Sequence, residues 1–312
     1  MKLSIIVPCF NEEENVRPFY EKTKECLAAI MDHVEIIFVD DGSSDRTAEE
    51  LKKLGEEADT HIRMVSFSRN FGKEAGLLAG LRAAEGDYVA VIDADLQQNP
   101  KYIVEMLTIL GEHPEYDCVA AYQNIRNEGK VLGFFKNSFY RMINRLTDIE
   151  FFRSASDFRL LSRKMVDSIL ALPERCRFSK GIFSWVGFKT YYMPYEVEER
   201  QNGKSKWNFW SLTSYALDGI VAFSDKPLIL SSVMGIVLFL ISLLLMLFVV
   251  VKTLLFGDPV AGFPTLCSLL LLLSGLQLLC IGIVGQYLAK MYEEVKGRPT
   301  YIVKEEYDNK EN

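Results

Sequence analysis

Two long stretches in the C-terminal third of the chain carry no charged residue, and they limit what this chain can fold into. They lie between residues 226 and 252 and between residues 258 and 290. A helix over the apolar centre of the first stretch, residues 228–251, would be about 36 Å long, enough to cross a hydrocarbon layer of roughly 30 Å. Buried helices of soluble proteins are seldom apolar on all sides over such a length. The sequence therefore predicts a hairpin of two transmembrane helices, at about 228–251 and 266–288.

Basic residues around these stretches predict how the hairpin is oriented. The link between the two helices holds a single lysine, Lys252, whereas the outer flanks hold more basic residues: Lys204, Lys206, Lys226, Lys290, Lys296 and Arg298. Cytoplasmic flanks of membrane helices are enriched in Lys and Arg. We therefore expect a multi-pass protein of the plasma membrane with both termini in the cytoplasm. Its expected segments are a globular domain (1–205), an interfacial juxtamembrane segment (206–226), the helical hairpin (227–290) and a cytoplasmic tail (291–312).

Charge and cysteine pattern argue against several other classes of protein. The net charge is −7, whereas nucleic-acid-binding domains usually carry a basic surplus, so we expect no nucleic-acid partner. The six cysteines form no C-x-x-C pair, and the three histidines lie far apart in the sequence. A structural zinc site and a disulfide framework are both disfavoured by this pattern.

Residues 1–125 alternate short apolar runs with helical patterns, which is typical of an α/β domain. The expected strands are 3–7, 34–40, 62–68, 87–93 and 117–122. Asn11, followed three residues later by Glu14, predicts the N-terminal cap of a helix that runs to about Met31. Nearly continuous apolar strands that alternate with helices indicate a mostly parallel sheet covered on both faces, in which ligands bind beyond the carboxyl ends of the strands.

Acidic clusters follow two of the expected strands. Asp40 and Asp41 end the second strand, and Asp93 and Asp95 end the fourth, with Gln97 close behind. Two carboxylates spaced in this way can bind one hard cation, which would neutralise negative charge on a diphosphate leaving group. Aspartates at strand ends also cap turns without any further role. No G-x-G-x-x-G follows the first strand and no G-x-x-x-x-G-K-[ST] occurs, so a dinucleotide site and a P-loop lack support.

The ordered set of motifs resembles the family 2 glycosyltransferases of the GT-A fold. The motifs are IIVPCFNEEENV, VDDGSSDRT, SRNFGKEAGLLAGL, DADLQQNP and SDFRLLSRK. R-x-x-G-x-S-K-W at residues 200–207 and the two apolar stretches narrow the resemblance to the polyprenyl-phosphate glycosyltransferases, such as bactoprenol glucosyltransferases and dolichyl-phosphate mannose synthase. This resemblance implies a GT-A, Rossmann-like catalytic domain joined to the C-terminal hairpin.

The resemblance also implies a role for each matching residue. Nucleotide-sugar binding falls to Pro8, Phe10, Glu12, Asp40, Asp41, Arg69, Lys73, Asp93 and Ala94. Metal binding, with Mg²⁺ or Mn²⁺ as the cofactor, falls to Asp93, Asp95 and Gln97. The implied catalytic residues are Asp95, Asp157, Arg200 and Lys206, and those facing the acceptor phosphate are Arg159, Arg163 and Lys204. Arg159 and Arg163 also fit the solvated start of a helix.

The chemistry of the implied acceptor is consistent with these roles. A lipid monophosphate is mostly dianionic at pH 7 and scarcely needs a general base, so Asp157 is expected to orient groups rather than to remove a proton. Basic residues and a metal offset the repulsion between this dianion and the donor diphosphate. Residues 129–148 have the pattern of a basic amphipathic helix at a membrane surface, and 206–223 hold the aromatic residues of an interfacial belt.

We therefore expect an inverting transferase that moves one hexose from a nucleotide-diphosphate sugar to undecaprenyl phosphate at the cytoplasmic membrane face. UDP-glucose is the leading donor, with UDP-N-acetylglucosamine and GDP-mannose as alternatives, and the product would serve cell-envelope glycan modification. A homo-oligomer is expected, with a tetramer suited to this branch. A processive synthase is disfavoured because no Q-x-x-R-W follows the acceptor region. A catalytically silent membrane scaffold that binds nucleotide sugar is the alternative from another class.

Overall fold

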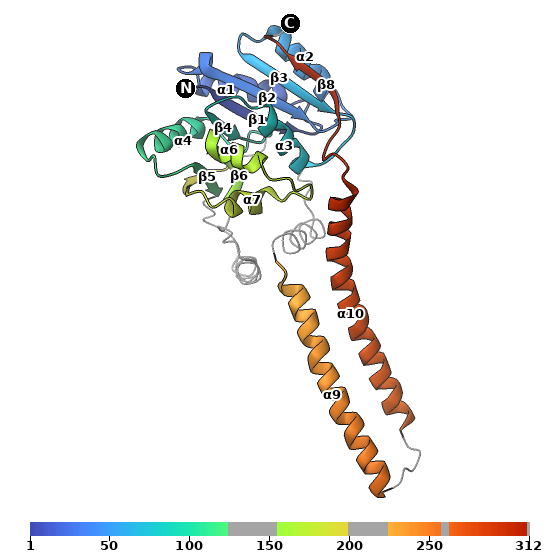
Figure 1. Cartoon of the computed structure of the whole chain (residues 1–312). Coiled ribbons are helices and arrows are strands. Elements are labelled where there is room, and N and C mark those ends of the chain that lie inside the picture. The colour runs from blue at the N-terminus through green and yellow to red at the C-terminus, as the bar shows by residue number, and fades with distance from the viewer. Residues whose placement is uncertain (124–154, 199–223, 257–261, 311–312) are drawn as a thin grey trace.

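The computed structural model describes residues 1–123, 155–198, 224–256 and 262–310 (Figure 1). Its strands are β1 (Leu3–Cys9), β2 (Val34–Asp40), β3 (His61–Phe67), β4 (Tyr88–Val91), β5 (Cys118–Gln123), β6 (Ala155–Ser162), β7 (Thr190–Tyr195) and β8 (Val303–Asp308). Its helices are α1 (Val16–Cys26), α2 (Thr47–Glu57), α3 (Lys73–Ala83), α4 (Lys101–Glu112), α6 (Arg163–Leu170), α7 (Ser179–Trp185), α9 (Lys226–Phe256) and α10 (Phe263–Lys296), with a short 3₁₀ turn, η1 (Met31–His33).

The strands form one sheet in the order β7-β5-β6-β4-β1-β2-β3-β8. β4, β1, β2 and β3 are parallel to one another, and β6 enters antiparallel between β4 and β5. This arrangement confirms the predicted α/β architecture with a mostly parallel sheet. Because Val91 of β4 pairs with Arg159 of β6, the beginning of β6 lies at the carboxyl end of β4. The acidic residues of both strands therefore meet at one edge of the sheet.

Helices cover both faces of the sheet and bury an apolar layer on each side. Side chains from α1, α2 and α4 pack on one face against alternate residues of β1 and β2, such as Ile5 and Phe38. Side chains from α3, α6 and α7 pack on the other face against the intervening residues, such as Ile6 and Val39. α3 lies very close to β1, because a Cβ on Gly80 would stand 2.2 Å from Cγ2 of Ile6. This packing fixes the start of α3 near the carboxyl ends of the parallel strands.

The C-terminal segment returns to the globular domain as an edge strand. β8 pairs antiparallel with β3, on the far side of the sheet from β7. Tyr301 stacks on Phe67 with ring centroids 4.8 Å apart, and the carbonyl of Ile302 accepts a hydrogen bond from the backbone N–H of Ser68 at 3.0 Å. The sequence predicts only a cytoplasmic tail here, over residues 291–312, and VKEEYD is too charged to resemble a buried strand. As an edge strand β8 leaves its charged side chains in water, which explains the composition.

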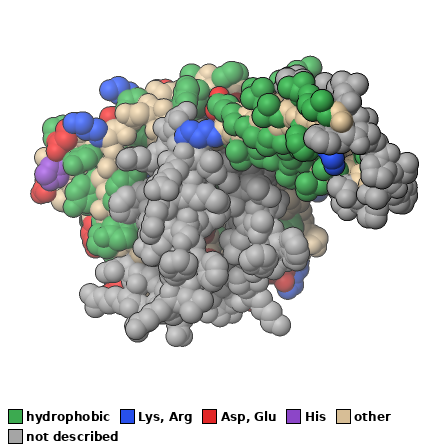
Figure 2. Space-filling view, turned by 90° about the horizontal axis from the view of Figure 1, so that it is seen from below, with side chains coloured by type: hydrophobic (Ala, Val, Ile, Leu, Met, Phe, Trp, Pro, Cys, Tyr) green, Lys and Arg blue, Asp and Glu red, His purple; other side chains and the backbone are tan. Residues whose placement is uncertain are grey.

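Two long helices connect this strand to the rest of the domain. α9 and α10 run side by side and project away from the sheet (Figure 1). Their surface is dominated by exposed hydrophobic side chains, as the view from below shows (Figure 2). Within the described residues, one helical segment, Leu272–Lys296, is long and apolar enough to cross a membrane by length and composition, and a shorter apolar helical stretch covers Lys226–Leu238.

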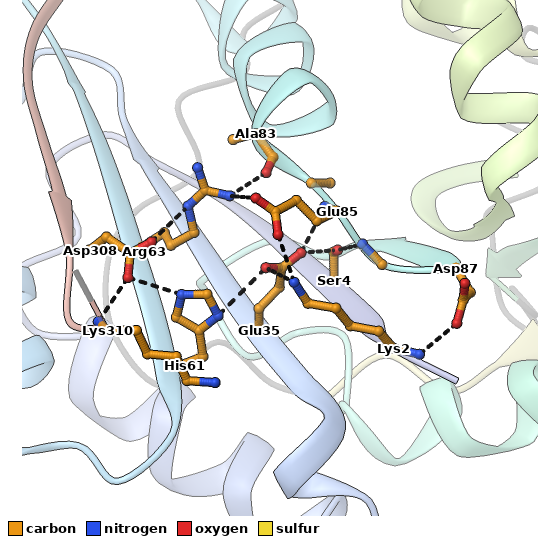
Figure 3. A network of polar contacts seen from close by, with 12 residues as sticks. Lys2, Ser4, Glu35, His61, Arg63, Ala83, Glu85, Asp87, Asp308 and Lys310 are labelled. Carbon is orange, nitrogen blue, oxygen red and sulfur yellow. Dashed lines mark hydrogen bonds and ion pairs between the residues drawn. The ribbon is translucent and has the colours of Figure 1, made fainter.

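A buried carboxylate, Glu35, links the amino ends of β1 and β2 (Figure 3). Glu35 on β2 is fully buried and accepts hydrogen bonds from the Ser4 hydroxyl and from the backbone N–H of Glu85, the latter at 2.8 Å. Nζ of Lys2 lies 3.0 Å from its second oxygen. Burial alone would raise the pKa of Glu35, but these hydrogen bonds and the lysine outweigh burial and lower it. Glu35 therefore stabilises the fold in its ionised form.

Replacing Glu35 by Gln is expected to reduce stability at pH 7 by about 1–3 kcal/mol, because Lys2 loses one of its two carboxylate partners and a buried amide N–H₂ would face groups that themselves donate hydrogen bonds. A lowered pKa in the folded state gives stability that is present above the unfolded-state pKa of about 4.3 and lost as the pH falls through the folded-state value. The difference between wild type and variant should therefore shrink between about pH 5 and pH 3. Urea unfolding of detergent-solubilised protein, followed by circular dichroism, measures both effects.

Glu50→Gln is the matched control, since Glu50 is paired with Lys53 at 2.7 Å on the surface. An exposed pair of this kind contributes little to stability, because water and salt screen its attraction. Equal losses in the two variants, or a difference that does not depend on pH, would contradict the role assigned to Glu35.

Candidate functional site

The loops that follow β1 and β2 are hydrogen-bonded to each other. Asn11 has a left-handed backbone with φ of 55°, and its N–H donates to the Ser43 hydroxyl at 2.9 Å. The N–H of Ser44 donates in return to Oδ1 of Asn11 at 2.9 Å. The predicted helix cap at Asn11 and Glu14 is therefore wrong: α1 begins at Val16, and the Asn11 amide binds the neighbouring loop instead. Left-handed backbone at a residue other than glycine is uncommon and often marks a functional loop.

The three residues predicted to contact the nucleotide from the first segment lie at this place. Pro8 belongs to β1, opposite Val39 of β2, and is half-buried. Phe10 and Glu12 follow the strand and are also half-buried, and the Glu12 N–H donates to the Thr47 hydroxyl at 2.9 Å. The structure thus brings all three to the carboxyl edge of the sheet.

Asp40 joins two strands at the same edge. Its side chain is buried, and its Oδ2 accepts a hydrogen bond from the Ser66 hydroxyl of β3 at 2.7 Å. Its Oδ1 accepts from the N–H of Ser43 at 3.0 Å. Both carboxylate oxygens of Asp40 therefore have partners within the protein, and they fix the turn after β2.

Asp41 holds the loop before α3. Its two carboxylate oxygens accept hydrogen bonds from the backbone N–H groups of Phe71, at 2.6 Å, and Gly72, at 2.9 Å. Burial raises the pKa of Asp41, against the effect of these two hydrogen bonds. The guanidinium of Arg69 lies 4.1 Å from the centroid of the Phe71 ring and is exposed. By holding the backbone of Phe71 and Gly72, Asp41 fixes the loop that carries Arg69 at the carboxyl edge of the sheet.

Gly42 allows these two loops to approach. Its φ is 64°, and a Cβ at this position would lie 2.3 Å from the carbonyl carbon of Arg69. Any other residue would push the Arg69 loop away from the turn that follows β2.

The D-x-D segment continues from β4 in a strained turn. Asp93 and Asp95 are half-buried, and Ala94 between them is buried. Leu96, also buried, has φ of 58°, an uncommon conformation for a residue of this size. A turn with this backbone directs the two aspartates to the carboxyl edge while Leu96 enters the core.

Gln98, rather than Gln97, contacts the first aspartate. Oε1 of Gln98 accepts from the backbone N–H of Asp93 at 3.1 Å, and its Nε2 donates to the Ser156 hydroxyl at 3.2 Å. The N–H of Gln97 donates to Oδ1 of Asp95 at 3.2 Å. Gln98 thus links the D-x-D segment to β6, a role that its position one residue beyond the motif does not reveal.

Lys73 brings the metal motif and the acceptor motif together. Its Nζ lies 2.8 Å from Oδ1 of Asp93 and 2.9 Å from Oδ2 of Asp157. Burial alone would lower the pKa of Lys73, but the two carboxylates outweigh burial and raise it. In the same way burial would raise the pKa of Asp157, but attraction to Lys73, and then to Lys180, lowers it well below its usual range. Asp157 is therefore a carboxylate of very low basicity.

Two residues near this ion pair were missed by the sequence analysis. Glu74 follows Lys73 on α3, and its carboxylate accepts hydrogen bonds from the N–H and the hydroxyl of Ser179, the first residue of α7. The next residue, Lys180, is half-buried, and its positive charge helps to lower the pKa of Asp157. Lys180 belongs to none of the sequence motifs, so the sequence offers no signal for its position beyond its positive charge.

The predicted acceptor residues lie in different places. Arg159 is buried, with its guanidinium 3.9 Å from the centroid of the Phe183 ring of α7. Arg163 lies at the other end of β6, where its guanidinium donates to the carbonyls of Ala84 and Gly86 at 2.9 and 2.6 Å. The structure therefore does not bring Arg163 to the acidic edge, since it is occupied in joining α6 to the turn before β4. Arg200, Lys204 and Lys206 lie outside the described residues, as do the predicted amphipathic segment 129–148 and aromatic segment 206–223.

The oxygen-rich edge suits a hard divalent cation only with help from further ligands. Among the described residues, no cluster of three or more Asp, Glu, His or Cys side chains could hold a metal ion. Asp93 and Asp95 offer hard carboxylate oxygens, and a positive charge, the Lys73 ammonium, already lies against Asp93. Mg²⁺ in proteins is commonly held by one or two carboxylates together with substrate phosphates and water. The donor set fits that pattern.

A mostly parallel sheet covered on both faces, with a D-x-D segment at its ligand edge, defines a glycosyltransferase of the GT-A fold. The chain belongs to glycosyl transferase family 2, whose model matches residues 4–170. It is 40% identical over 310 residues to the SfII prophage-derived bactoprenol glucosyl transferase of Shigella flexneri, covering 98% of this chain and 99% of that protein. It is 38% identical over 307 residues to the prophage bactoprenol glucosyl transferase homolog of Escherichia coli, covering 97% and 99%.

Solved structures overlap with a smaller part of the chain. Glucosyl-3-phosphoglycerate synthase from Mycobacterium tuberculosis, crystallised with Mn²⁺, UDP and its product, is 20% identical with a TM-score of 0.46, covering 70% of this chain and 77% of that one. Mannosyl-3-phosphoglycerate synthase from Rubrobacter xylanophilus is 19% identical with a TM-score of 0.48, covering 71% and 73%. Family membership rests on the family model and on the full-length relatives.

Replacing Asp41 by Ala is expected to release the loop before α3, because the N–H groups of Phe71 and Gly72 lose their acceptor. We expect a stability loss of about 1–3 kcal/mol and faster tryptic cleavage after Arg69. Asp59→Ala is the control, since Asp59 is exposed and accepts hydrogen bonds from the side chains of Lys24 and Tyr20, away from the loop before α3. Unchanged cleavage at Arg69 in the Asp41 variant would contradict the role of this carboxylate.

Proposed function

We propose that this protein is an inverting glycosyltransferase that moves one hexose from a nucleotide-diphosphate sugar to polyprenyl phosphate, with undecaprenyl phosphate as the acceptor. The observation that carries the proposal is the convergence of Asp93, Lys73 and Asp157 at the edge where the D-x-D segment ends. The full-length similarity to proteins named bactoprenol glucosyl transferases supports the lipid acceptor and makes UDP-glucose the leading donor.

The position of the long helices supports a reaction at the membrane. α9 and α10 expose hydrophobic side chains along their length, which suits a hydrocarbon environment. We propose that both cross the plasma membrane as a hairpin, with the globular domain and both termini in the cytoplasm, consistent with the basic residues at their outer ends. Undecaprenyl phosphate would then keep its chain in the bilayer and its phosphate at the surface below the acidic edge. The product would serve cell-envelope glycan modification.

The transfer itself is a single displacement. A phosphate oxygen of the acceptor attacks the anomeric carbon of the sugar, the bond from that carbon to the diphosphate breaks, and the nucleoside diphosphate leaves, so the configuration inverts. A bound Mg²⁺ or Mn²⁺, held by Asp93 and Asp95, would supply positive charge against the departing diphosphate. The protein contributes Arg69 beside the nucleotide edge and Lys73 between the donor and acceptor sides. Bringing a dianionic acceptor to this place requires such positive charge.

Asp157 orients groups in this mechanism and does not remove a proton. Its carboxylate is paired with Lys73 at 2.9 Å, and its lowered pKa makes it a poor base. The acceptor phosphate needs none, because it is already mostly dianionic at pH 7. We propose that Lys180, beside Asp157, contacts the acceptor phosphate together with Arg200, Lys204 and Lys206. Arg159 contributes through its charge and through its contact with α7. Assembly as a homo-oligomer, a tetramer in the first instance, belongs to the same proposal.

The proposal is tested with detergent-purified protein, Mn²⁺ or Mg²⁺ and undecaprenyl phosphate. UDP-glucose, UDP-N-acetylglucosamine and GDP-mannose are supplied separately, and the lipid product is weighed by mass spectrometry. We expect one hexose per lipid, and we expect Asp95→Asn to lose transfer by about 10²-fold or more while remaining folded. Exposed Asp87→Asn is the matched control. Tight nucleotide binding without lipid product from any donor would instead favour a membrane scaffold that binds nucleotide sugar.

Asp157→Asn tests the assignment of this carboxylate. Turnover is expected to fall by roughly tenfold or more, because Lys73 loses one of its two anchors. Since the pKa of Asp157 is lowered, the carboxylate is fully ionised between pH 6 and 8, and the rate profiles of wild type and variant should keep the same shape in this range. Steady-state rates across this range make the comparison. A fall in rate toward low pH that is present in the wild type and lost in the variant would identify a general base instead.

A further inference from the structure

The Lys73 ammonium occupies the place where a cation would bind Asp93. Its Nζ lies 2.8 Å from Oδ1 of Asp93 and, on the other side, 2.9 Å from Oδ2 of Asp157. Asp93 is the first carboxylate of the D-x-D segment. Without a donor, one of the two candidate metal ligands is therefore already neutralised by a positive charge that the protein supplies itself.

A divalent cation that joined Asp93 would be repelled strongly by this ammonium. Carboxylate oxygens bind Mg²⁺ at about 2.1 Å, so the ion would come within roughly 5 Å of Nζ. At such a separation, in a half-buried site, repulsion between two positive charges is considerable. The metal and the lysine can share Asp93 only if negative charge arrives with the metal or if the lysine moves away.

The described residues supply little further negative charge to offset the repulsion between a metal ion and Lys73. They contain no cluster of three or more acidic, histidine or cysteine side chains that could hold a metal. The diphosphate of a nucleotide-sugar donor brings both oxygen ligands and two or more negative charges. Lys73 stands on the first turn of α3, next to the Asp41-anchored loop, and can keep its contact with Asp157 when a metal takes over Asp93. Its ammonium would then lie between the donor and the acceptor.

We propose that Lys73 is a built-in counter-cation that makes metal binding conditional on the donor. In the donor-free protein its single positive charge is shared between Asp93 and Asp157 and opposes the entry of a metal ion alone, so metal and nucleotide diphosphate bind together. The inference rests on the proposed function, in that it takes the D-x-D edge to be the site of a metal and a nucleotide diphosphate. It assigns to Lys73 a role that is separate from any contact with the sugar.

Mn²⁺ binding to the full-length protein in detergent tests the inference without any transfer reaction. Free Mn²⁺ is followed by electron paramagnetic resonance in titrations without nucleotide, with UDP and with GDP. Wild type should bind Mn²⁺ weakly alone and much more tightly with one of the nucleotides. Lys73→Gln and Lys73→Met should each bind Mn²⁺ alone roughly tenfold more tightly than wild type. Lys73→Arg, which keeps the charge, should remain weak.

Two further variants locate the effect. Lys52→Gln removes an equal charge from a surface pair with Glu305, at 2.7 Å, and should leave Mn²⁺ binding unchanged. Asp93→Asn combined with Lys73→Gln should remove the gained binding. If Lys73 merely supported the local structure, its replacement would weaken Mn²⁺ binding instead of strengthening it. Circular dichroism confirms that the compared variants are folded.

The outcomes separate this inference from the proposed function. If both neutral variants bind Mn²⁺ alone no more tightly than wild type, while UDP or GDP still promotes Mn²⁺ binding, the counter-cation role is overturned and the metal-dependent nucleotide site stands. If no protein binds Mn²⁺ with either nucleotide, the metal assignment fails, and the counter-cation role fails with it. A selective gain in the neutral variants, lost again with Asp93→Asn, supports it.

Discussion

One ammonium group joins three parts of the site that the chain builds separately. Lys73 begins α3, Asp93 follows β4 and Asp157 lies near the start of β6, and the two ion pairs of Lys73 hold these segments together. β6 runs antiparallel to β4, so without this lysine the facing carboxylates would repel one another. The close packing of α3 on β1, where Gly80 meets Ile6, sets the place of Lys73. The packing of a glycine against β1 thus helps to place the positive charge of Lys73 between Asp93 and Asp157.

The other acidic residues at this edge shape loops rather than wait for a ligand. Asp40 accepts a hydroxyl of β3, and Asp41 accepts two backbone N–H groups of the Arg69 loop. Carboxylates used in this way order a loop before the nucleotide arrives, which reduces the conformational entropy lost on binding. The family resemblance assigns Asp40 and Asp41 to the base and ribose as well. In the proposed function these two carboxylates would therefore serve both the fold and the nucleotide.

The sequence predicted the parallel core well, because alternation of apolar strands and helices is a local signal. It also placed Asp93, Asp157 and Lys73 in one site, through ordered motifs. The predictions were wrong or incomplete where contacts between residues distant in sequence determine the structure. Asn11 looked like a helix cap but binds the next loop, Arg163 looked like a phosphate ligand but holds carbonyls at the far end of β6, and β8 carries no apolar pattern. Lys180 was not predicted, because its position depends on a long-range contact. The carboxylate of Glu74, distant in sequence, accepts a hydrogen bond from the N–H of the neighbouring Ser179.

The return of the chain from α10 into β8 has a geometric consequence. Glu294 near the end of α10 accepts the backbone N–H groups of Arg175 and Cys176, at 2.8 and 2.7 Å, and Tyr301 then stacks on Phe67, next to the Arg69 loop. These contacts attach the end of α10 to the globular domain. With α10 embedded in a bilayer as proposed, this attachment would set the height of the acidic edge above the lipid. Under that proposal, the depth at which a lipid presents its phosphate would contribute to which acceptor reaches the acidic edge.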